Sequence, residues 1–289
     1  MLPNFELYRP TDIYEACRLK ERGALALAGG TDIFVDMHSG ELKPEAVVDI
    51  KNIAEMHTAT FKEDGLEIGA LTTHRYIEEW DVVKEHYSAL YEACSSVGSV
   101  QIRHRGTLGG NICTAAPSAD SVGPLLVFDA QCIIIGDKGK RMVPLSNFFV
   151  GPKKTILNKD ELLCKIVVPL PDKNSGSAFI KYTRRKSMDL ALLGVCVYTS
   201  LNGDLLEDIR IALSTAAPTP IRAYNTEKMF RGNKVKDISL EEMGKQAALE
   251  ASPRSSWRAS REFRLKLIEE LVPYAFNTSI SRVKGEKSI

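Results

Sequence analysis

The residues best suited to binding chemistry lie in two glycine-rich segments. Residues 29–30 are a Gly-Gly pair within LAGGTD, and residues 109–110 are a second pair within TLGGNICTAAPSAD. Adjacent glycines cost backbone entropy, so they are kept where a positive φ or a close approach to the backbone is needed. Bare N–H groups in such a turn bind anions, and a diphosphate is the usual large anion. Because Thr31 and Thr107 accompany the pairs, we predict one diphosphate held from two sides; two unrelated tight turns are the alternative.

Polar side chains accompany the second segment. Thr107 and Asn111 can add hydrogen bonds to a diphosphate, and Asp120 can accept hydrogen bonds from ribitol or ribose hydroxyls. Asp120 also fits the pattern of a helix cap. Cys113 follows Asn111 by two residues, and His104 is the histidine nearest in sequence, although its arginine neighbours suit a solvated loop.

Other chemistries lack their sequence patterns. The six cysteines and five histidines are scattered, with no CxxC and no HxxxH, so we predict no metal site and no iron–sulfur cluster. No G-x-G-x-x-G follows a strand, and neither a P-loop nor a G-x-S-x-G motif occurs. These absences argue against a dinucleotide-binding Rossmann domain, a P-loop NTPase and an acyl-transfer site.

Composition limits the class of protein. The 289 residues are 44% hydrophobic and 26% charged, which is ordinary for a globular chain of two or three domains. The 38 basic and 37 acidic residues leave a net charge of +1, which argues against binding to nucleic acid or to an anionic membrane. The sequence contains no apolar run of about 20 residues and no signal peptide. We expect a cytoplasmic protein.

The elements that must position the glycine segments form three successive units. The first is a small α/β unit, in which a strand over 24–28 enters the first Gly-Gly pair and a helix follows it. The second combines strands with helices, one of them capped by Thr72 or Thr73. The expected elements of these units are a helix capped by Thr11; strands at 47–50, 58–61, 66–70, 132–135, 141–143 and 161–168; and helical stretches through Trp80, over 86–97 and from Ser118.

A third unit follows the turn-rich sequence PLPDKNSG at 169–176. Strand-like runs cover 177–184, 190–201 and 206–214, and Asn202-Gly203 predicts a hairpin between the last two. Helices are expected over 223–231, 240–251 and about 257–276, packed on one face of an antiparallel sheet. The predicted fold is α+β, with α/β character in the first units, and the predicted domains are 1–56, 57–173 and 174–289.

Five segments carry a family resemblance. They are AGGTD (28–32), IGALTT (68–73), QIRHRGTLGGNICTAAPSADS (101–121), AAPTPIRA (216–223) and SSWRASREFR (255–264). In this order they resemble the FAD-binding medium subunits of molybdenum hydroxylases, the xanthine dehydrogenase and carbon monoxide dehydrogenase group. The resemblance covers essentially the whole chain, and PRSSWRASREFR is most similar to bacterial xanthine dehydrogenase subunits.

The resemblance implies a fold and a set of cofactor contacts. Two subdomains of the vanillyl-alcohol-oxidase (PCMH) type would clasp non-covalent FAD, and a C-terminal α+β domain would close over the flavin. By motif match, the pyrophosphate contacts would come from two groups, Leu25, Ala26, Leu27, Ala28, Gly29, Gly30, Thr31 and Asp32 in the first and Thr107, Gly109, Gly110 and Asn111 in the second. Asp120 would bind the sugar alcohol, Leu162 or Leu163 would make an apolar contact, and Lys181 would lie near the flavin ring. Leu190 stands where some relatives place an aromatic residue over the ring.

The resemblance also implies an electron relay. A molybdenum–pterin large subunit would hydroxylate a purine or another heterocycle, and a [2Fe–2S] small subunit would pass electrons to FAD. FAD would deliver them to NAD or another acceptor, within an assembly that is often (αβγ)2. The wide cysteine spacing excludes the [4Fe–4S] loop that some relatives carry.

Two other classes are alternatives. A stand-alone oxidase of the vanillyl-alcohol-oxidase type shares the flavin clasp, but many of those enzymes attach FAD to a histidine, and AGGTD contains none. A non-catalytic assembly subunit would have lost its cofactor, which the intact glycine segments and Asp120 argue against.

Overall fold

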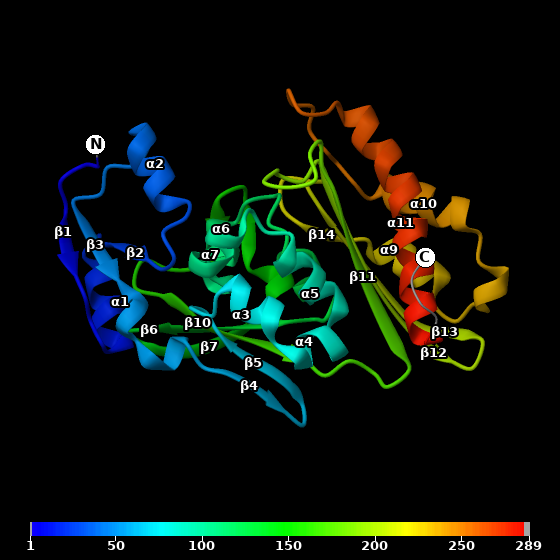
Figure 1. The fold of residues 1–289 in the computed structure, drawn as a ribbon, viewed down its shortest axis with the longest axis horizontal. Coiled ribbons are helices and arrows are strands. Elements are labelled where there is room, and N and C mark those ends of the chain that lie inside the picture. The colour runs from blue at the N-terminus through cyan, green and yellow to red at the C-terminus, as the bar shows by residue number, and fades with distance from the viewer. Residues whose placement is uncertain (1, 286–289) are drawn as a thin grey trace.

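The first unit is a small parallel α/β unit, as predicted. The computed structural model describes residues 2–285, and its three units lie in a row along the long axis of the molecule (Figure 1). A three-stranded sheet has the order β1-β3-β2, and both pairings are parallel. Asp12, not Thr11, caps the first helix, because its carboxylate accepts from the Glu15 N–H at 2.9 Å. The elements are β1 (Glu6–Tyr8), α1 (Ile13–Glu21), β2 (Leu25–Leu27), α2 (Ile33–Ser39) and β3 (Ala46–Asp49).

The second unit is a five-stranded antiparallel sheet, order β4-β5-β10-β6-β7, with short helices packed on it. Thr73 caps α3, as expected. The strands are β4 (Ala59–Lys62), β5 (Gly65–Gly69), β6 (Gln131–Gly136), β7 (Gly139–Pro144) and β10 (Leu162–Pro169), with a small hairpin of β8 (Phe149–Gly151) and β9 (Lys154–Thr155). The helices are α3 (His74–Glu79), α4 (Asp81–His86), α5 (Ser88–Ser95), α6 (Val100–Arg105), α7 (Leu108–Thr114) and α8 (Val122–Val127), and short 3-10 turns cover Ile50–Asn52, Ala54–Met56 and Leu145–Asn147.

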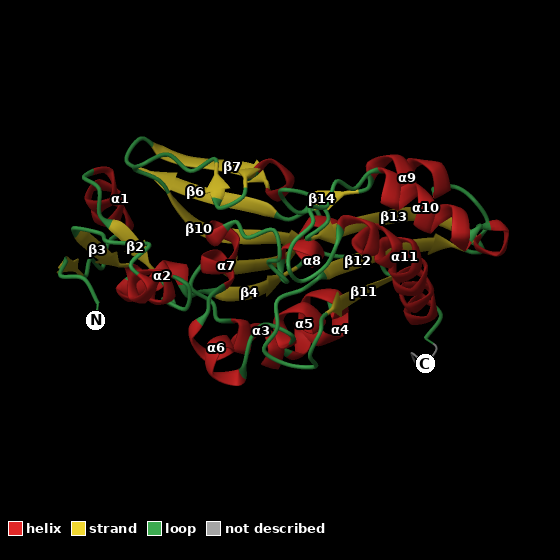
Figure 2. Cartoon of the chain, turned by 90° about the horizontal axis from the view of Figure 1, so that it is seen from above, coloured by secondary structure: helices red, strands yellow, loops and turns green. Residues whose placement is uncertain are grey.

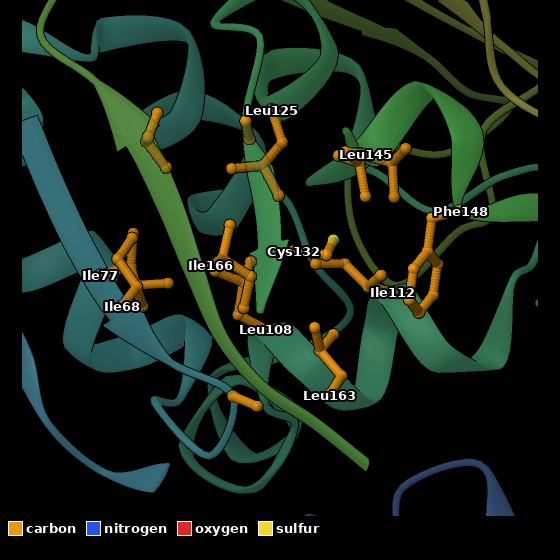
Figure 3. Close-up of a cluster of buried hydrophobic side chains, with 14 of the residues drawn as sticks. Ile68, Ile77, Leu108, Ile112, Leu125, Cys132, Leu145, Phe148, Leu163 and Ile166 are labelled. Carbon is orange, nitrogen blue, oxygen red and sulfur yellow. The ribbon is translucent and has the colours of Figure 1, made fainter. Parts of the chain in front are cut away.

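Helix α7, which carries the second Gly-Gly pair, is anchored in the main hydrophobic core. Leu108 and Ile112 of α7 are fully buried and belong to the same core as Leu163 and Ile166 of β10 (Figure 3). Burying a side chain of this size contributes about 1.5–3 kcal/mol. The second Gly-Gly pair is therefore held in place by the buried residues Leu108 and Ile112, which lie on either side of it in α7.

The third unit is a four-stranded antiparallel sheet, order β11-β12-β13-β14. The predicted hairpin is confirmed, but its two turn residues are Gly203, with a φ of +60°, and Asp204, because Asn202 still pairs with Leu205. The strands are β11 (Ser175–Tyr182), β12 (Leu193–Asn202), β13 (Leu205–Ser214) and β14 (Ile221–Arg222). The helices are α9 (Tyr224–Phe230), α10 (Leu240–Leu249) and α11 (Arg261–Val283), with a 3-10 turn at Val235–Asp237.

Both faces of this sheet are covered, although helices were expected on one face only. Val195 and Val197 of β12 lie in a core shared with residues of α10 and α11. Cys196 and Tyr198, which point the other way, belong to the core of the second unit. Alternate residues of a strand face opposite sides of a sheet, so β12 joins two cores. Helices α5 and α8 contact this second face, and the third unit is fixed against the second.

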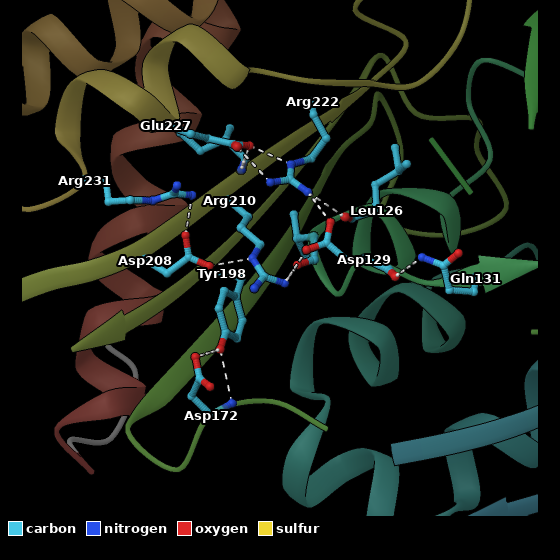
Figure 4. Close-up of polar contacts among 12 residues, drawn as sticks. Leu126, Asp129, Gln131, Asp172, Tyr198, Asp208, Arg210, Arg222, Glu227 and Arg231 are labelled. Carbon is cyan, nitrogen blue, oxygen red and sulfur yellow. Dashed lines mark hydrogen bonds and ion pairs between the residues drawn. The ribbon is translucent and has the colours of Figure 1, made fainter. Parts of the chain in front are cut away.

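A polar network reinforces this junction at the end of α8 (Figure 4). Arg222 of β14 donates to the Leu126 carbonyl at 3.0 Å and to the Asp129 carboxylate at 2.8 Å. Its other nitrogens make a bidentate pair with Glu227 at 2.6 and 2.7 Å. Arg210 also pairs with Asp129, at 2.8 Å. Planar guanidinium groups suit such two-sided bonding.

Helix α11 begins later and ends later than the sequence pattern indicated. It starts at Arg261, because Ser260 is its N-cap and accepts from the Phe263 N–H at 3.2 Å. Residues 251–259 precede it without regular structure, apart from a bend. The apolar spacing around Trp257 therefore does not belong to a helix.

Removal of this cap should weaken the third unit modestly. We expect Ser260→Ala to lower the free energy of unfolding by about 1 kcal/mol, because a helix N–H loses its acceptor. Urea denaturation followed by circular dichroism measures the change. Ser260→Asp keeps an acceptor at this position and should be close to wild type; equal losses in both variants would contradict the capping role.

Candidate functional site

A single cleft of about 760 Å³ gathers the predicted site residues from all three units. Every residue of the predicted set lines it except Leu27, whose side chain is buried in the small core of the first unit with Met37 and Val47. A cleft of this volume falls within the roughly 300–1,000 Å³ typical of small-molecule and cofactor sites. Helices α2 and α7 lie near each other (Figure 2), and the Thr114 hydroxyl at the end of α7 donates to the Asp32 carboxylate at the start of α2 at 3.0 Å.

The first Gly-Gly pair has the geometry that its sequence predicted. Gly30 has a φ of +78°, a conformation that side chains with a Cβ rarely adopt. Gly29 instead touches the end of α6, since a Cβ on it would lie 1.9 Å from the carbonyl oxygen of Arg105. One glycine is required by backbone conformation and its neighbour by close contact.

The backbone of this segment offers free donors. Within residues 2–285, the N–H groups of Gly29, Gly30, Thr31 and Asp32 make no hydrogen bond, and all four residues line the cleft. Buried or half-buried backbone donors normally find a partner. Several N–H groups along one short stretch form the concavity that accepts the oxygens of an anion.

The second Gly-Gly pair is built differently, and the interpretation of it as a turn with bare amides is wrong. It lies in the first turn of α7, where Thr107 is the N-cap. The Gly109 N–H donates to the Ala70 carbonyl at 2.9 Å, and the Gly110 N–H donates to the Thr107 hydroxyl oxygen at 3.0 Å. The Asn111 N–H donates to the Thr107 carbonyl at 2.9 Å. The capping Thr107 thus accepts from the Gly110 and Asn111 amides, and Ala70 accepts from the Gly109 amide.

The two glycines of α7 serve different purposes. A Cβ on Gly109 would lie 2.4 Å from the Cβ of Ala70, so this glycine permits close packing on the end of β5. A Cβ on Gly110 would meet the Thr107 hydroxyl at 2.8 Å, and its next neighbour is the Cβ of Ala28 at 3.9 Å. Gly110 therefore lies in the wall of the cleft next to the first glycine segment, and a side chain on it would contact Ala28.

Side chains, not amides, supply the donors of the second segment. The Thr107 oxygen accepts from Gly110, which leaves its hydroxyl hydrogen available to a ligand. The Asn111 Oδ1 atom accepts from the Ser121 hydroxyl at 2.7 Å, which leaves the Nδ2 group to donate. An anion in the cleft would meet backbone donors on one side and these two side chains on the other.

Asp120 and Lys181 form a buried ion pair. The Lys181 Nζ atom lies 2.6 Å from the Asp120 Oδ2 atom, and the two side chains are 11% and 9% exposed. Lys181 also donates to the Ser96 carbonyl at 3.0 Å. Burial raises the pKa of Asp120 to about 6, and the nearby Lys181 ammonium opposes that rise. The Oδ1 atom of Asp120 has no partner within residues 2–285, so a ligand hydroxyl could donate to it after a small adjustment.

Apolar residues form part of the remaining wall. Leu162 and Leu163 of β10 line the cleft from the core side and are almost fully buried. Leu190 lies at the mouth and is 50% exposed. Cys113 also lines the cleft, but burial raises the pKa of its thiol to about 12, so the reactive thiolate is scarce at neutral pH.

His74 is the residue that sequence reasoning missed. It is 1% exposed, lines the cleft, and has an Nδ1 atom with no partner within the described residues. His104, the histidine nearest to the glycine pair in sequence, is exposed on α6 and does not line the cleft. The capping residue Thr73 predicts where α3 begins. It does not predict that His74, the first residue of α3, lies beside Gly106.

The burial of His74 predicts a pH dependence of stability. Desolvation, with a smaller contribution from the Arg103 charge, lowers the pKa of His74 from 6.5 to about 4. The unfolded chain then binds a proton that the native chain does not, so the native state loses stability as pH falls from 6.5 toward 4. Between pH 8 and pH 5, we expect the free energy of unfolding to drop by about 2 kcal/mol more in wild type than in His74→Gln. Urea titrations of the cofactor-free chains at both pH values measure this; equal drops would contradict it.

Two family models account for most of the chain. The model described as the FAD binding domain in molybdopterin dehydrogenase matches residues 3–171, and that of the CO dehydrogenase flavoprotein C-terminal domain matches 178–279. This chain belongs to the FAD-binding subunits of the molybdenum hydroxylases. The predicted family and the predicted cofactor are both confirmed.

Individual relatives of these FAD-binding subunits agree. The chain is 38% identical over 265 residues to the xanthine dehydrogenase FAD-binding subunit of Escherichia coli O157:H7, with 91% of each chain covered. It is 33% identical to the nicotinate dehydrogenase FAD-subunit of Eubacterium barkeri, over 70% of this chain and 74% of that one. Among solved structures, it matches carbon monoxide dehydrogenase from Hydrogenophaga pseudoflava with a TM-score of 0.92, at 28% identity and with 98% and 99% of the chains covered. The predicted fold class is confirmed.

Residues 2–285 hold no group of three or more His, Cys, Asp or Glu side chains that could bind a metal ion. None of the helices in that range combines the length and apolar character needed to cross a membrane.

Proposed function

We propose that this FAD-binding subunit relays electrons from [2Fe–2S] clusters of a partner subunit, through FAD held in the cleft, to NAD or another acceptor. The four N–H groups of residues 29–32, which make no hydrogen bond within residues 2–285 and belong to residues that line the cleft, are the observation that carries this assignment. They suit a diphosphate, which FAD has at its centre. The homologous complexes include dehydrogenases of xanthine, nicotinate and carbon monoxide.

Residues of the cleft would serve the diphosphate and the ribityl chain of FAD. Residues 29–32 would donate backbone hydrogen bonds to the diphosphate, and Thr107 and Asn111 would donate from the opposite side. Asp120 would accept from the ribityl hydroxyls through its unpartnered Oδ1 atom. Leu162 and Leu163 would exclude water from one side of the cofactor.

Lys181 and Leu190 would lie nearest the flavin ring. Lys181 is held in place by Asp120 and by the Ser96 carbonyl, so its positive charge has a fixed position. Leu190 is aliphatic and half-exposed, so the mouth of the cleft stays open at that point. When bound, FAD supplies the exchange between single-electron and two-electron transfer. The chain would bind and orient the cofactor and would not use a protein acid, base or nucleophile.

The proposed assembly contains two further kinds of subunit. A molybdenum–pterin large subunit would hydroxylate a purine or another heterocycle, and a [2Fe–2S] small subunit would connect it to FAD, in an (αβγ)2 complex. We further propose that the domains are 1–56, 57–173 and 174–289, with the third packed over the cleft through Lys181 and Leu190.

The cofactor assignment is tested by the absorbance spectrum of the purified chain. We expect a flavin spectrum with about one FAD per chain, and acid precipitation should release all of the colour into the supernatant. Flavin retained in the pellet would favour an oxidase with a covalent flavin. A chain that neither contains nor takes up FAD would favour a non-catalytic assembly subunit.

The relay is tested by co-expression with candidate molybdenum and [2Fe–2S] subunits. The three chains should co-purify, and the complex should hydroxylate a heterocycle, whereas this chain alone should not. Xanthine turnover by the single chain, or failure to associate with any such partner, would contradict the relay.

A further inference from the structure

His74 lies where the two glycine-rich segments meet. Its backbone N–H donates to the Gly106 carbonyl at 3.1 Å. From the position that a Cβ on Gly106 would take, the His74 Cδ2 atom is 3.4 Å away and the Thr31 hydroxyl oxygen is 3.6 Å away. Gly29 approaches the same place, since a Cβ on it would lie 3.1 Å from the Gly106 Cα atom. The imidazole thus borders the stretch in which backbone donors line the cleft.

One edge of the ring faces the protein and the other faces the cleft. The Nδ1 atom is fully buried and has no hydrogen-bond partner within residues 2–285. Nε2 also makes no hydrogen bond within residues 2–285, but unlike Nδ1 it is not fully buried, so it is the ring nitrogen that a ligand in the cleft can reach. A buried N–H without an acceptor is rarer and more costly than a buried lone pair without a donor. This favours the tautomer with its proton on Nε2, where it can point toward a ligand.

From this geometry we infer that His74 is a diphosphate-binding residue of the cleft, which donates a hydrogen bond from Nε2 to a phosphate oxygen. The inference rests on the proposed FAD binding and adds a side-chain donor to the backbone donors of residues 29–32. The Arg103 guanidinium, whose charge helps to lower the pKa of His74, is paired with the Glu78 carboxylate at 2.8 Å. His74 is then an uncharged donor before the ligand arrives.

The test compares FAD with ADP, which carries the diphosphate but no flavin. For His74→Leu we expect affinities for FAD and for ADP to fall by the same factor, about 10–100-fold, because a hydrogen bond to a charged group is lost. Flavin fluorescence measures the first affinity and calorimetry the second. His74→Gln places a neutral amide donor near the Nε2 position and should restore most of both affinities.

Several outcomes would overturn the inference. Unchanged affinities in His74→Leu would remove His74 from the site. Weaker FAD binding with unchanged ADP binding would place the contact on the flavin half, not on the diphosphate. If wild type binds ADP but not FAD, the proposed function fails, while a loss of ADP affinity in His74→Leu would still support the inference.

A second measurement does not depend on the folding of a variant. In wild type labelled with 15N-histidine and held at pH 5, His74 stays neutral because its pKa is lowered to about 4, and NMR should show this neutral histidine with its proton on Nε2 before ligand is added. Addition of ADP should shift that Nε2 resonance more than any other histidine nitrogen. A proton on Nδ1, or a resonance that ADP leaves in place, would contradict the inference.

Discussion

Gly110→Asp is expected to abolish FAD retention and leave a folded, colourless chain. A Cβ at this position has the Thr107 hydroxyl and Ala28 as its neighbours, so the new side chain must project between the two glycine segments. Like charges about 4 Å apart repel by roughly 4 kcal/mol at a partly buried site, which corresponds to a loss of about 1,000-fold in affinity. FAD titration of the cofactor-free chain measures it, and circular dichroism checks the fold.

Two matched variants separate charge from size. Gly110→Ala adds a Cβ close to the Thr107 cap but no charge, and Gly110→Asn has nearly the shape of aspartate. Both should bind FAD far more tightly than Gly110→Asp. If all three bind equally weakly, the loss comes from the disturbed cap, and the diphosphate does not lie next to Gly110.

Lys181→Met is expected to destabilise the chain by about 3–5 kcal/mol at pH 8, because it leaves the Asp120 carboxylate buried without its partner. Urea denaturation of the cofactor-free chain measures this loss. The loss should shrink at pH 5, where Asp120 takes up a proton and its unpaired charge disappears, since burial already raises the pKa of Asp120 to about 6 with Lys181 present.

The double variant Lys181→Met/Asp120→Asn removes both charges and should recover most of the stability. Lys245→Met, which breaks a surface pair with Glu241 on α10, is the control and should be indistinguishable from wild type. A loss in Lys181→Met that persists in the double variant would indicate a packing defect and not an unpaired charge.

Much of the local structure could be predicted from short-range patterns. The Asn202-Gly203 hairpin, the Thr73 cap and the strand that enters the first Gly-Gly pair all follow from residues a few positions apart. A backbone conformation with positive φ, which favours glycine, is also a local property, and Gly30 adopts one. The family resemblance added the cofactor, because motifs spread over the whole chain agreed in order.

Helix starts were harder to predict where a second capping residue or a preceding apolar stretch suggested another first residue. Asp12 caps α1 next to the expected Thr11, and Ser260 caps α11 after an apolar stretch that suggested an earlier start. Thr107 caps α7 and also lines the cleft, but the sequence pattern predicts only a ligand contact there and not the helix. Because the amides of Gly109 and Gly110 are hydrogen-bonded within the protein, the second Gly-Gly pair does not offer bare N–H groups to an anion.

The cleft itself depends on contacts between distant parts of the chain. Asp120 and Lys181 were expected at different parts of the cofactor, yet they form one ion pair across 61 positions of sequence. Gly109 is needed because Ala70 packs against it, and His74 enters the site through its contact with Gly106. Sequence periodicity reports which residues turn inward, but not which inward residues of another element they meet. The order of the elements and the diphosphate chemistry were therefore readable from the sequence, whereas the pairing of charges and the division of donors between backbone and side chains depend on how the three units pack.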